Sequence, residues 1–328
     1  MKNETSIFSV DCPTCKICGS YGTLIYKGLQ DRLFSAPGIW NLRQCKNTKC
    51  GLIWLDPMPL EADIHKAYRL YYTHDKNSRE GWFFTQLLAK IVIQILKLFL
   101  RLTPLHRERK AFSRMYLENI KPGRLLEVGC GDGTRLTQLA ALGWFVEGQE
   151  VDPISAAAAR EKGIKIHLGP LENIRLPDAS YDAIVMNHVI EHLYEPVILL
   201  SECRRLLSSQ GTLISVTPNI SSFGHRIFKS NWRGLEPPRH IFLYSQGSLR
   251  RIAQMAGFKN PTSWTTASGA HHFAQGSLKI IYGSNKLNLF NKTVCYFAPK
   301  LFLLVARLVQ AFDNDSGEEC VLMLRNGQ

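Results

Sequence analysis

Short apolar segments alternate with helical patterns from Lys121 onward. Strands that alternate with helices along a chain are typical of a parallel sheet with helices packed on its faces. Ligands of such sheets collect at the carboxyl ends of the strands. The sequence therefore predicts an α/β fold with its functional site along that edge. The five strands predicted from the pattern are Arg124–Val128, Phe145–Val151, Lys165–Leu168, Tyr181–Met186 and Thr212–Val216.

Three glycines follow the first of these strands at every second position. Gly129, Gly131 and Gly133 separate the strand from a helical pattern that begins near Arg135. A strand–loop–helix of this kind leaves backbone N–H groups at a helix N-terminus, and glycine lets a ligand approach the backbone closely. Glu150, at the end of the next strand, could accept hydrogen bonds from a ribose diol. The pattern indicates a nucleotide-type cofactor.

The spacing of the glycines differs from that of folds that bind dinucleotide cofactors. The chain reads G-x-G-x-G with Glu127 two residues before the first glycine, whereas dinucleotide-binding folds prefer G-x-G-x-x-G. This run resembles motif I of the class I S-adenosylmethionine (SAM) methyltransferases. Residues 187–192, Asn-His-Val-Ile-Glu-His, resemble motif IV of small-molecule methyltransferases, and residues 122–266 resemble the family throughout. The resemblance implies a Rossmann-like class I methyltransferase sheet with an antiparallel last strand, SAM as cofactor and methyltransferase activity.

The resemblance also assigns cofactor-binding residues by position. Glu127 and the glycine loop would face the methionine end, Glu150 the ribose with Asp152 second in line, and Glu172 the adenine. Asp152 and Glu172 could instead be solvated surface residues. The full predicted set is Glu127, Gly129, Gly131, Asp132, Gly133, Glu150, Asp152, Glu172 and Asn187.

Three residues after the fourth strand are candidates for catalysis. His188, Glu191 and His192 are spaced i, i+3, i+4, which predicts that they share one face of a helical turn. In the ubiquinone-biosynthetic O-methyltransferases, which this segment resembles, an acidic residue, a Glu and a His at matching positions hold a divalent metal. His188 departs from that pattern, so we expect His192 or His188 to act as a base without metal. Alternatively, Glu191 and His192 only orient the helix.

A rigid loop further along supplies the predicted acceptor site. Trp232 could stack on a sugar or aromatic ring, Arg239 could hold a phosphate or carboxylate, and His240 completes the catalytic set. Both Trp232 and Arg239 could instead be packing residues. The chain resembles small-molecule methyltransferases and, in its N-terminal cysteines, zinc-bearing members that act on sugars. This resemblance implies O-methylation of a small-molecule or glycan acceptor, with a lipid-linked sugar as one candidate. The alternatives are an RNA or protein methyltransferase and a non-catalytic SAM-binding scaffold.

The net charge of +13 is unevenly distributed. Residues 1–121 carry 19 basic and 10 acidic side chains, whereas residues 122–259 carry 15 and 13. A nearly neutral catalytic region disfavours a nucleic-acid partner, and the basic upstream part could meet phosphate groups or an anionic membrane. Residues 1–10 are polar, so we expect no secretory signal and a cytoplasmic protein, peripheral at the membrane if the basic part binds lipid.

The nine cysteines fall into two groups, of which one is confined to the first fifty residues. Cys15-Lys16-Ile17-Cys18 and Cys45 to Cys50 are each followed by glycine, which permits a tight turn around thiolate sulfur. Four thiolates from two turns make a closed tetrahedral zinc site, and disulfides are less expected without an export signal. Cys12 with Cys15 is a rival first pair, and reduced, unliganded thiols are the alternative. The predicted ligands of a structural zinc are Cys15, Cys18, Cys45 and Cys50.

Two apolar segments carry basic stripes, one before the predicted domain and one inserted late within it. Residues 83–102 place polar or basic residues at steps of three and four among apolar ones, and Phe297–Phe312 is apolar except for Lys300, Arg307 and Gln310. Their apolar faces require a membrane, a homodimer partner or the domain's own flank. The predicted organisation is a zinc-knuckle module (1–75), a basic amphipathic helical segment (76–121) and a methyltransferase domain (122–328). The last contains a helical insertion at about 268–315, between strands Ser263–Ala267 and Glu319–Leu324.

Overall fold

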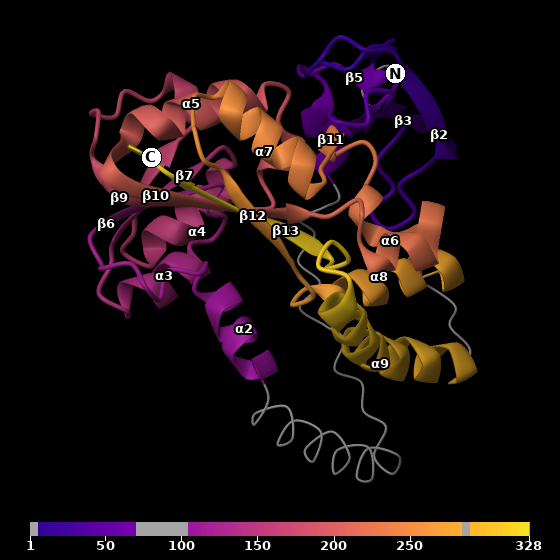
Figure 1. Ribbon diagram of the computed structural model, residues 1–328. Coiled ribbons are helices and arrows are strands. Elements are labelled where there is room, and N and C mark those ends of the chain that lie inside the picture. The colour runs from indigo at the N-terminus through magenta and orange to yellow at the C-terminus, as the bar shows by residue number, and fades with distance from the viewer. Residues whose placement is uncertain (1–5, 70–103, 284–288, 328) are drawn as a thin grey trace. The chain divides into compact units, whose positions relative to one another are not determined.

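The computed structural model describes residues 6–69, 104–283 and 289–327 (Figure 1). The chain forms two compact units, Met1–Leu70 with Pro122–Gln328 and, separately, Tyr71–Lys121. The described part of the smaller unit contains helix α2 (Pro104–Ser113). The amphipathic helix predicted over residues 83–102 lies outside the described residues.

A seven-stranded sheet with the order β12-β13-β10-β9-β6-β7-β8 forms the centre of the larger unit. The five strands from β6 to β10 pair in parallel, and β13 runs antiparallel to both of its neighbours. This arrangement confirms the predicted mostly parallel sheet with an antiparallel last strand. Its strands are β6 (Arg124–Val128), β7 (Phe145–Glu150), β8 (Lys165–Leu168), β9 (Tyr181–Asn187), β10 (Leu207–Pro218), β12 (Thr262–Thr266) and β13 (Glu319–Arg325).

Helices cover both faces of this sheet, with α3 and α4 on one side and α5 and α7 on the other (Figure 1). A sheet covered on both faces requires strands without polar alternation, and residues 183–186 of β9 are accordingly all buried. Strand β10 begins at Leu207, earlier than the predicted Thr212, and a register shift between these two residues absorbs the extra chain. The covering helices are α3 (Thr134–Ala140), α4 (Pro153–Glu161), α5 (Pro196–Leu206) and α7 (Gln246–Met255).

The cysteine-bearing segment forms a second, four-stranded sheet with the order β11-β4-β3-β2. Three of its strands, β2 (Gly22–Leu29), β3 (Trp40–Cys45) and β4 (Ile53–Leu55), come from the N-terminal region. The fourth, β11 (Phe242–Leu243), comes from the region after the predicted acceptor loop and pairs antiparallel with β4. The two regions therefore share backbone hydrogen bonds as well as one hydrophobic core. A small ladder of β1 (Ser9–Val10) with β5 (Met58–Pro59) lies beside them.

Two helices, α8 (Ala270–Tyr282) and α9 (Leu289–Phe312), are inserted between β12 and β13 and pack against each other (Figure 1). A short helix, α6 (Phe223–Phe228), also contacts both. The remaining connections contain single 3₁₀ turns, which are η1 (Ile64–Tyr68), η2 (Leu171–Asn173), η3 (Ile190–His192), η4 (Lys229–Asn231) and η5 (Arg233–Leu235).

Candidate active site

The carboxyl ends of three neighbouring strands bring the predicted cofactor residues together. Strand β6 pairs in parallel with β7 on one side and with β9 on the other. Glu127 therefore lies next to the strand end that carries Glu150 and the one that carries Asn187. These side chains and the glycine loop lie along one edge of the sheet, as the sequence pattern predicted.

The glycine loop is open at its centre. Gly129, Gly131 and Gly133 all have positive φ values, of +65°, +55° and +73°, a region that other residues adopt at a cost. A Cβ atom at Gly129 would lie 2.6 Å from a methyl group of Val189, whereas a Cβ at Gly131 would meet nothing within 4 Å. A ligand can therefore approach the backbone at Gly131.

Two buried oxygen atoms beside this loop have no hydrogen-bond partner among the described residues, Glu127 Oε2 and Asn187 Oδ1. The other oxygen of Glu127 accepts a hydrogen bond from Arg135 Nη1 at 2.7 Å. Burial raises the pKa of Glu127 to about 7, and Arg135 only partly opposes this effect. Buried acceptors without donors are unfavourable, and the ammonium and hydroxyl groups of a cofactor such as SAM would supply donors. The residues present therefore fit that cofactor.

Glu150 holds the glycine loop in place. Its Oε2 accepts from the backbone N–H of Gly131 at 2.7 Å, and its Oε1 accepts from those of Val151 at 2.8 Å and Asp152 at 3.0 Å. A carboxylate offers about four lone-pair positions, so this side chain can still accept a bond from a ribose hydroxyl. Glu150 therefore both holds the glycine loop and lies where it can bind the ribose of the cofactor.

The remaining predicted cofactor residues make local contacts. Asp132 accepts from Lys162 Nζ at 2.7 Å, and this bond lowers the pKa of Asp132 to about 2. Asp152 caps α4 through the backbone N–H of Ser155 at 2.9 Å, which explains its position without reference to a ligand. Glu172 is exposed on η2.

The predicted helical turn that would align all three catalytic candidates is wrong for His188. This residue has a φ of +55°, and η3 begins only at Ile190. His188 instead lies between two carboxylates, with Nδ1 at 3.0 Å from Glu191 Oε1 and Nε2 at 2.8 Å from Glu319 Oε1. Burial disfavours its charged form, but the two carboxylates outweigh burial and raise the pKa of His188 to about 10. Both ring nitrogens therefore carry protons at neutral pH.

Sequence reasoning missed Glu319, which is buried and lies 131 positions from its histidine partner. The antiparallel pairing of β13 with β10 brings it beside the end of β9. Thr217, whose hydroxyl donates to Glu191 Oε2 at 2.9 Å, was also missed. Neither residue has a local sequence pattern that could have identified it.

Glu191, His192 and His240 form a second group, in which their potential ligand atoms lie within 4.8 Å of one another. Nδ1 of His192 lies 3.0 Å from the carbonyl of Arg239, and Nδ1 of His240 lies 2.7 Å from that of Gly234. A ring nitrogen that donates to a carbonyl leaves the other nitrogen unprotonated in the neutral ring. Burial lowers the pKa of His240 to about 4, so its ring is neutral at pH 7.

The two predicted acceptor residues make the contacts of packing residues. Arg239 is fully buried, and its nitrogens donate to Glu236 Oε1 at 2.8 Å, Asp31 Oδ2 at 2.7 Å and the carbonyl of Ala67 at 2.8 Å. It thereby ties the N-terminal region to the loop before β11. Trp232 is 1% exposed and stacks on Phe273 with ring centroids 5.5 Å apart.

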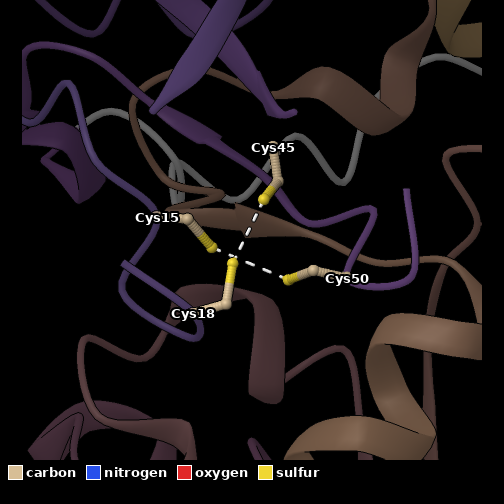
Figure 2. Close-up of side chains that lie close together, drawn as sticks. All are labelled: Cys15, Cys18, Cys45 and Cys50. Atoms are coloured by element: carbon tan, nitrogen blue, oxygen red, sulfur yellow. Dashed lines mark hydrogen bonds between the residues drawn. The ribbon is translucent and has the colours of Figure 1, made fainter. Parts of the chain in front are cut away.

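The four predicted zinc ligands do come together (Figure 2). Their sulfur atoms lie within 4.8 Å of one another, with Cys15 and Cys50 3.7 Å apart and Cys18 and Cys45 3.3 Å apart. Zinc–sulfur bonds of about 2.3 Å in a tetrahedron place sulfurs about 3.8 Å apart, so the donor set fits zinc.

The turns around these cysteines have the predicted form. Gly19 and Gly51, which follow Cys18 and Cys50, have φ values of +70° and +61°. The backbone N–H groups of Ile17 and Cys18 partly offset the rise that burial causes in the pKa of Cys15, as that of Asn47 does for Cys45. The rival Cys12 lies outside the cluster, and its thiol donates to the carbonyl of Thr14.

The sheet order and the open glycine loop together define a class I methyltransferase domain. Residues 101–262 match the family model of a methyltransferase domain. The chain belongs through this domain to the class I family of SAM-dependent methyltransferases.

Curated relatives are similar over part of their length. A probable S-adenosylmethionine-dependent methyltransferase of Mycolicibacterium smegmatis is 38% identical over 138 residues, which cover 41% of this chain and 51% of the relative. A probable S-adenosylmethionine-dependent methyltransferase of Mycobacterium tuberculosis is 34% identical over 101 residues, which cover 30% of this chain and 37% of the relative. A ubiquinone biosynthesis O-methyltransferase of Cereibacter sphaeroides is 26% identical, with coverage of 43% and 66%. The chain thus spans about half or less of the first two relatives.

Solved structures with a similar fold include a SAM-dependent methyltransferase of Thermotoga maritima, with 20% identity and a TM-score of 0.45 over 71% of this chain and 96% of that one. Phosphoethanolamine N-methyltransferase 2 of Haemonchus contortus, solved with SAM, has 15% identity and a TM-score of 0.46 over 68% of this chain and 53% of that one.

Proposed function

We propose that this protein is a SAM-dependent O-methyltransferase acting on a small-molecule or glycan acceptor. The observation that carries the cofactor is the pair of unpartnered buried oxygens, Glu127 Oε2 and Asn187 Oδ1, beside the open backbone at Gly131. Bound SAM supplies an electrophilic methyl group, and its transfer to an oxygen is an in-line displacement. The tasks of the chain are then to align the acceptor and to remove its proton.

His192 is the base that the contacts favour. Its Nδ1 faces the carbonyl of Arg239, so Nε2 of the neutral ring is free of hydrogen. The side chain is only partly buried, whereas His240 and Glu191 are buried. Because His188 is protonated between Glu191 and Glu319, we assign it the positive charge of the site in place of the predicted role as base.

A cavity of about 280 Å³ between the turn after β2 and the loop at 230–237 is the proposed acceptor entrance. Lys27 and Arg32 are exposed and line it. Asp31 accepts from Arg239, and Glu236 is ion-paired with both Arg233 and Arg239, so these acids are neutralised internally. Lys27 and Arg32 have no acidic partner of this kind among the described residues, so the cavity favours an acceptor that carries a phosphate, such as a phosphorylated or lipid-linked sugar.

Two contacting aromatic side chains lie between the cavity and His188. Trp232 lines the cavity and stacks on Phe273, whose ring centroid lies 6.3 Å from that of His188. We propose that the four-cysteine cluster binds zinc with a folding role, because four protein ligands leave no open coordination position.

Calorimetric titration of the purified protein with SAM and S-adenosylhomocysteine tests the function. Micromolar binding of both, followed by methyl transfer to a phosphorylated sugar from a panel of acceptors, is the expected result. Binding without transfer to any sugar or phenol would favour the non-catalytic scaffold. Absence of binding to folded, zinc-loaded protein would overturn the proposal.

The affinity for S-adenosylhomocysteine is expected to depend on pH through Glu127. The pKa of this carboxyl is raised to about 7 in the free protein, so acid protonates it and removes the acceptor for the ligand's ammonium group. Affinity should fall about tenfold between pH 7.5 and pH 6, since one pH unit below a pKa leaves roughly a tenth of the group ionised. In Glu127→Gln the affinity should be lower and nearly constant over this range. A wild-type affinity that does not change with pH would contradict the assignment.

The variant Glu319→Gln is expected to lower kcat about tenfold while leaving the affinity for S-adenosylhomocysteine unchanged. Removing one carboxylate lowers the pKa of His188, so the imidazolium is lost at a lower pH and the alkaline limb of the kcat profile moves to lower pH. The pH profile separates this effect from simple destabilisation. Glu195→Gln, on an exposed glutamate, is the matched control, and an unshifted profile in Glu319→Gln would exclude the role of His188.

A further inference from the structure

Helix α9 buries one face against the domain and exposes large apolar side chains on the other. Phe302, Leu303 and Ala306 pack against Ala267 and Ala270. The exposed side chains fall within about 80° of one another, since a helix turns about 100° per residue. They form one stripe along the helix, which we call the outer stripe: Phe297 (44% exposed), Leu301 (63%), Val305 (37%), Leu308 (64%) and Phe312 (93%).

Basic residues flank the outer stripe. Lys300 and Arg307 lie two helical turns apart on the same side of it, and Lys300 Nζ lies 3.3 Å from the ring centroid of the exposed Tyr296. The sequence from Ala270 to Phe312 contains no aspartate or glutamate. Its charged residues are all basic: Lys279, Lys286, Lys292, Lys300 and Arg307.

We propose that the outer stripe docks on a membrane surface that contains anionic phospholipids, with α9 lying in the plane of the headgroups. Apolar side chains would enter the acyl boundary while lysine and arginine reach the phosphates. Tyrosine is favoured at this depth. A second copy of the chain is a poorer occupant, because the charged residues of two α9 helices are all basic and repel each other. This inference stands independently of the proposed function.

The contacts of α9 favour lying on the membrane over crossing it. Among the described residues, Val294–Phe312 is the one helical segment long and apolar enough to span a bilayer, with a mean hydropathy of 1.5. The same segment holds Gln310, whose side chain donates to the carbonyl of Thr265 at 2.6 Å and accepts from the backbone N–H of Ala267. Crossing the bilayer would break these bonds and expose the packed inner face to lipid.

Co-sedimentation of the full chain with vesicles tests the proposal. Wild-type protein should pellet with phosphatidylcholine vesicles that contain about a quarter phosphatidylglycerol, and high salt or alkaline carbonate should release it. The double variant Leu301→Asp/Leu308→Asp should partition about tenfold less. The matched control is Phe145→Asp/Ile198→Asp, which adds the same charge at residues 74% and 54% exposed elsewhere on the domain and should bind like wild type.

Several outcomes would overturn the proposal. Equal binding of the outer-stripe variant and wild type would show that another surface meets the lipid. The outcome would assign the stripe to a second copy if wild-type protein does not bind the vesicles but forms a dimer, and the outer-stripe variant does not form that dimer. Wild-type protein that resists carbonate extraction would indicate a spanning helix. Unchanged circular dichroism and S-adenosylhomocysteine affinity in both variants would establish that they are folded.

Discussion

Replacing Glu150 with alanine is expected to weaken S-adenosylhomocysteine binding about 100-fold, or roughly 2.7 kcal/mol. Two losses contribute to this effect. The ribose loses a charged acceptor, and the backbone N–H groups of Gly131, Val151 and Asp152 lose the carboxylate that holds the glycine loop. Calorimetric titration of wild type and variant at the same pH measures the difference.

The matched control for this variant is Glu195→Ala. Glu195 is exposed, and its side chain makes no capping bond to α5, so its removal deletes a carboxylate without disturbing the loop, and we expect an affinity change within about threefold. A thermal melt of each apo protein shows whether the loss in Glu150→Ala includes unfolding. Near-normal affinity in folded Glu150→Ala would exclude this residue as a cofactor ligand.

Replacing Cys45 with serine is expected to abolish tight zinc binding and to reduce the free energy of unfolding by about 4 kcal/mol or more. Cys45 ends β3, and the sheet that contains β3 also includes β11, which comes from the catalytic domain. Loss of the metal should therefore lower the stability of the whole larger unit. Metal analysis and denaturant unfolding measure the two quantities.

Cys12→Ser is the control for this experiment. Cys12 is also buried, but its sulfur lies outside the cluster and donates to the carbonyl of Thr14, a bond that a serine hydroxyl can also make. This variant should retain zinc and most of the stability. Stoichiometric zinc in Cys45→Ser, or a wild-type protein whose unfolding is unaffected by zinc removal, would contradict the proposed site.

The sheet and the cofactor edge could be predicted because their information is local. Each strand from β6 to β9 is a short segment between turn residues, and the helical patterns between these segments indicate parallel strands. The spacing of three glycines in the sequence was enough to predict a tight loop, and the structure gives positive φ values at Gly129, Gly131 and Gly133. The clustering of the four cysteines followed from two turns that each end in glycine.

The prediction for the catalytic residues failed because it inferred side-chain contacts from spacing in the sequence. The i, i+3, i+4 pattern placed His188 on a helical face, but its backbone is left-handed and its ring turns toward Glu319. A helix or strand periodicity relates only residues within one element, so it cannot predict a contact between His188 and Glu319, which are 131 positions apart. The charge state of His188 depends on this pairing, so its chemistry could not be inferred from its neighbours in sequence.

The sequence alone determined the class of sheet, the position of the cofactor edge and the four sulfur atoms that meet, because backbone geometry and residue spacing control each of these. Only the tertiary structure decided which side chains are available for chemistry. Arg239 looked suited to a phosphate until Asp31, Ala67 and Glu236 were found to surround its guanidinium. The partners of a buried charge come from distant segments, and those partners decide whether it binds a ligand or holds the fold together.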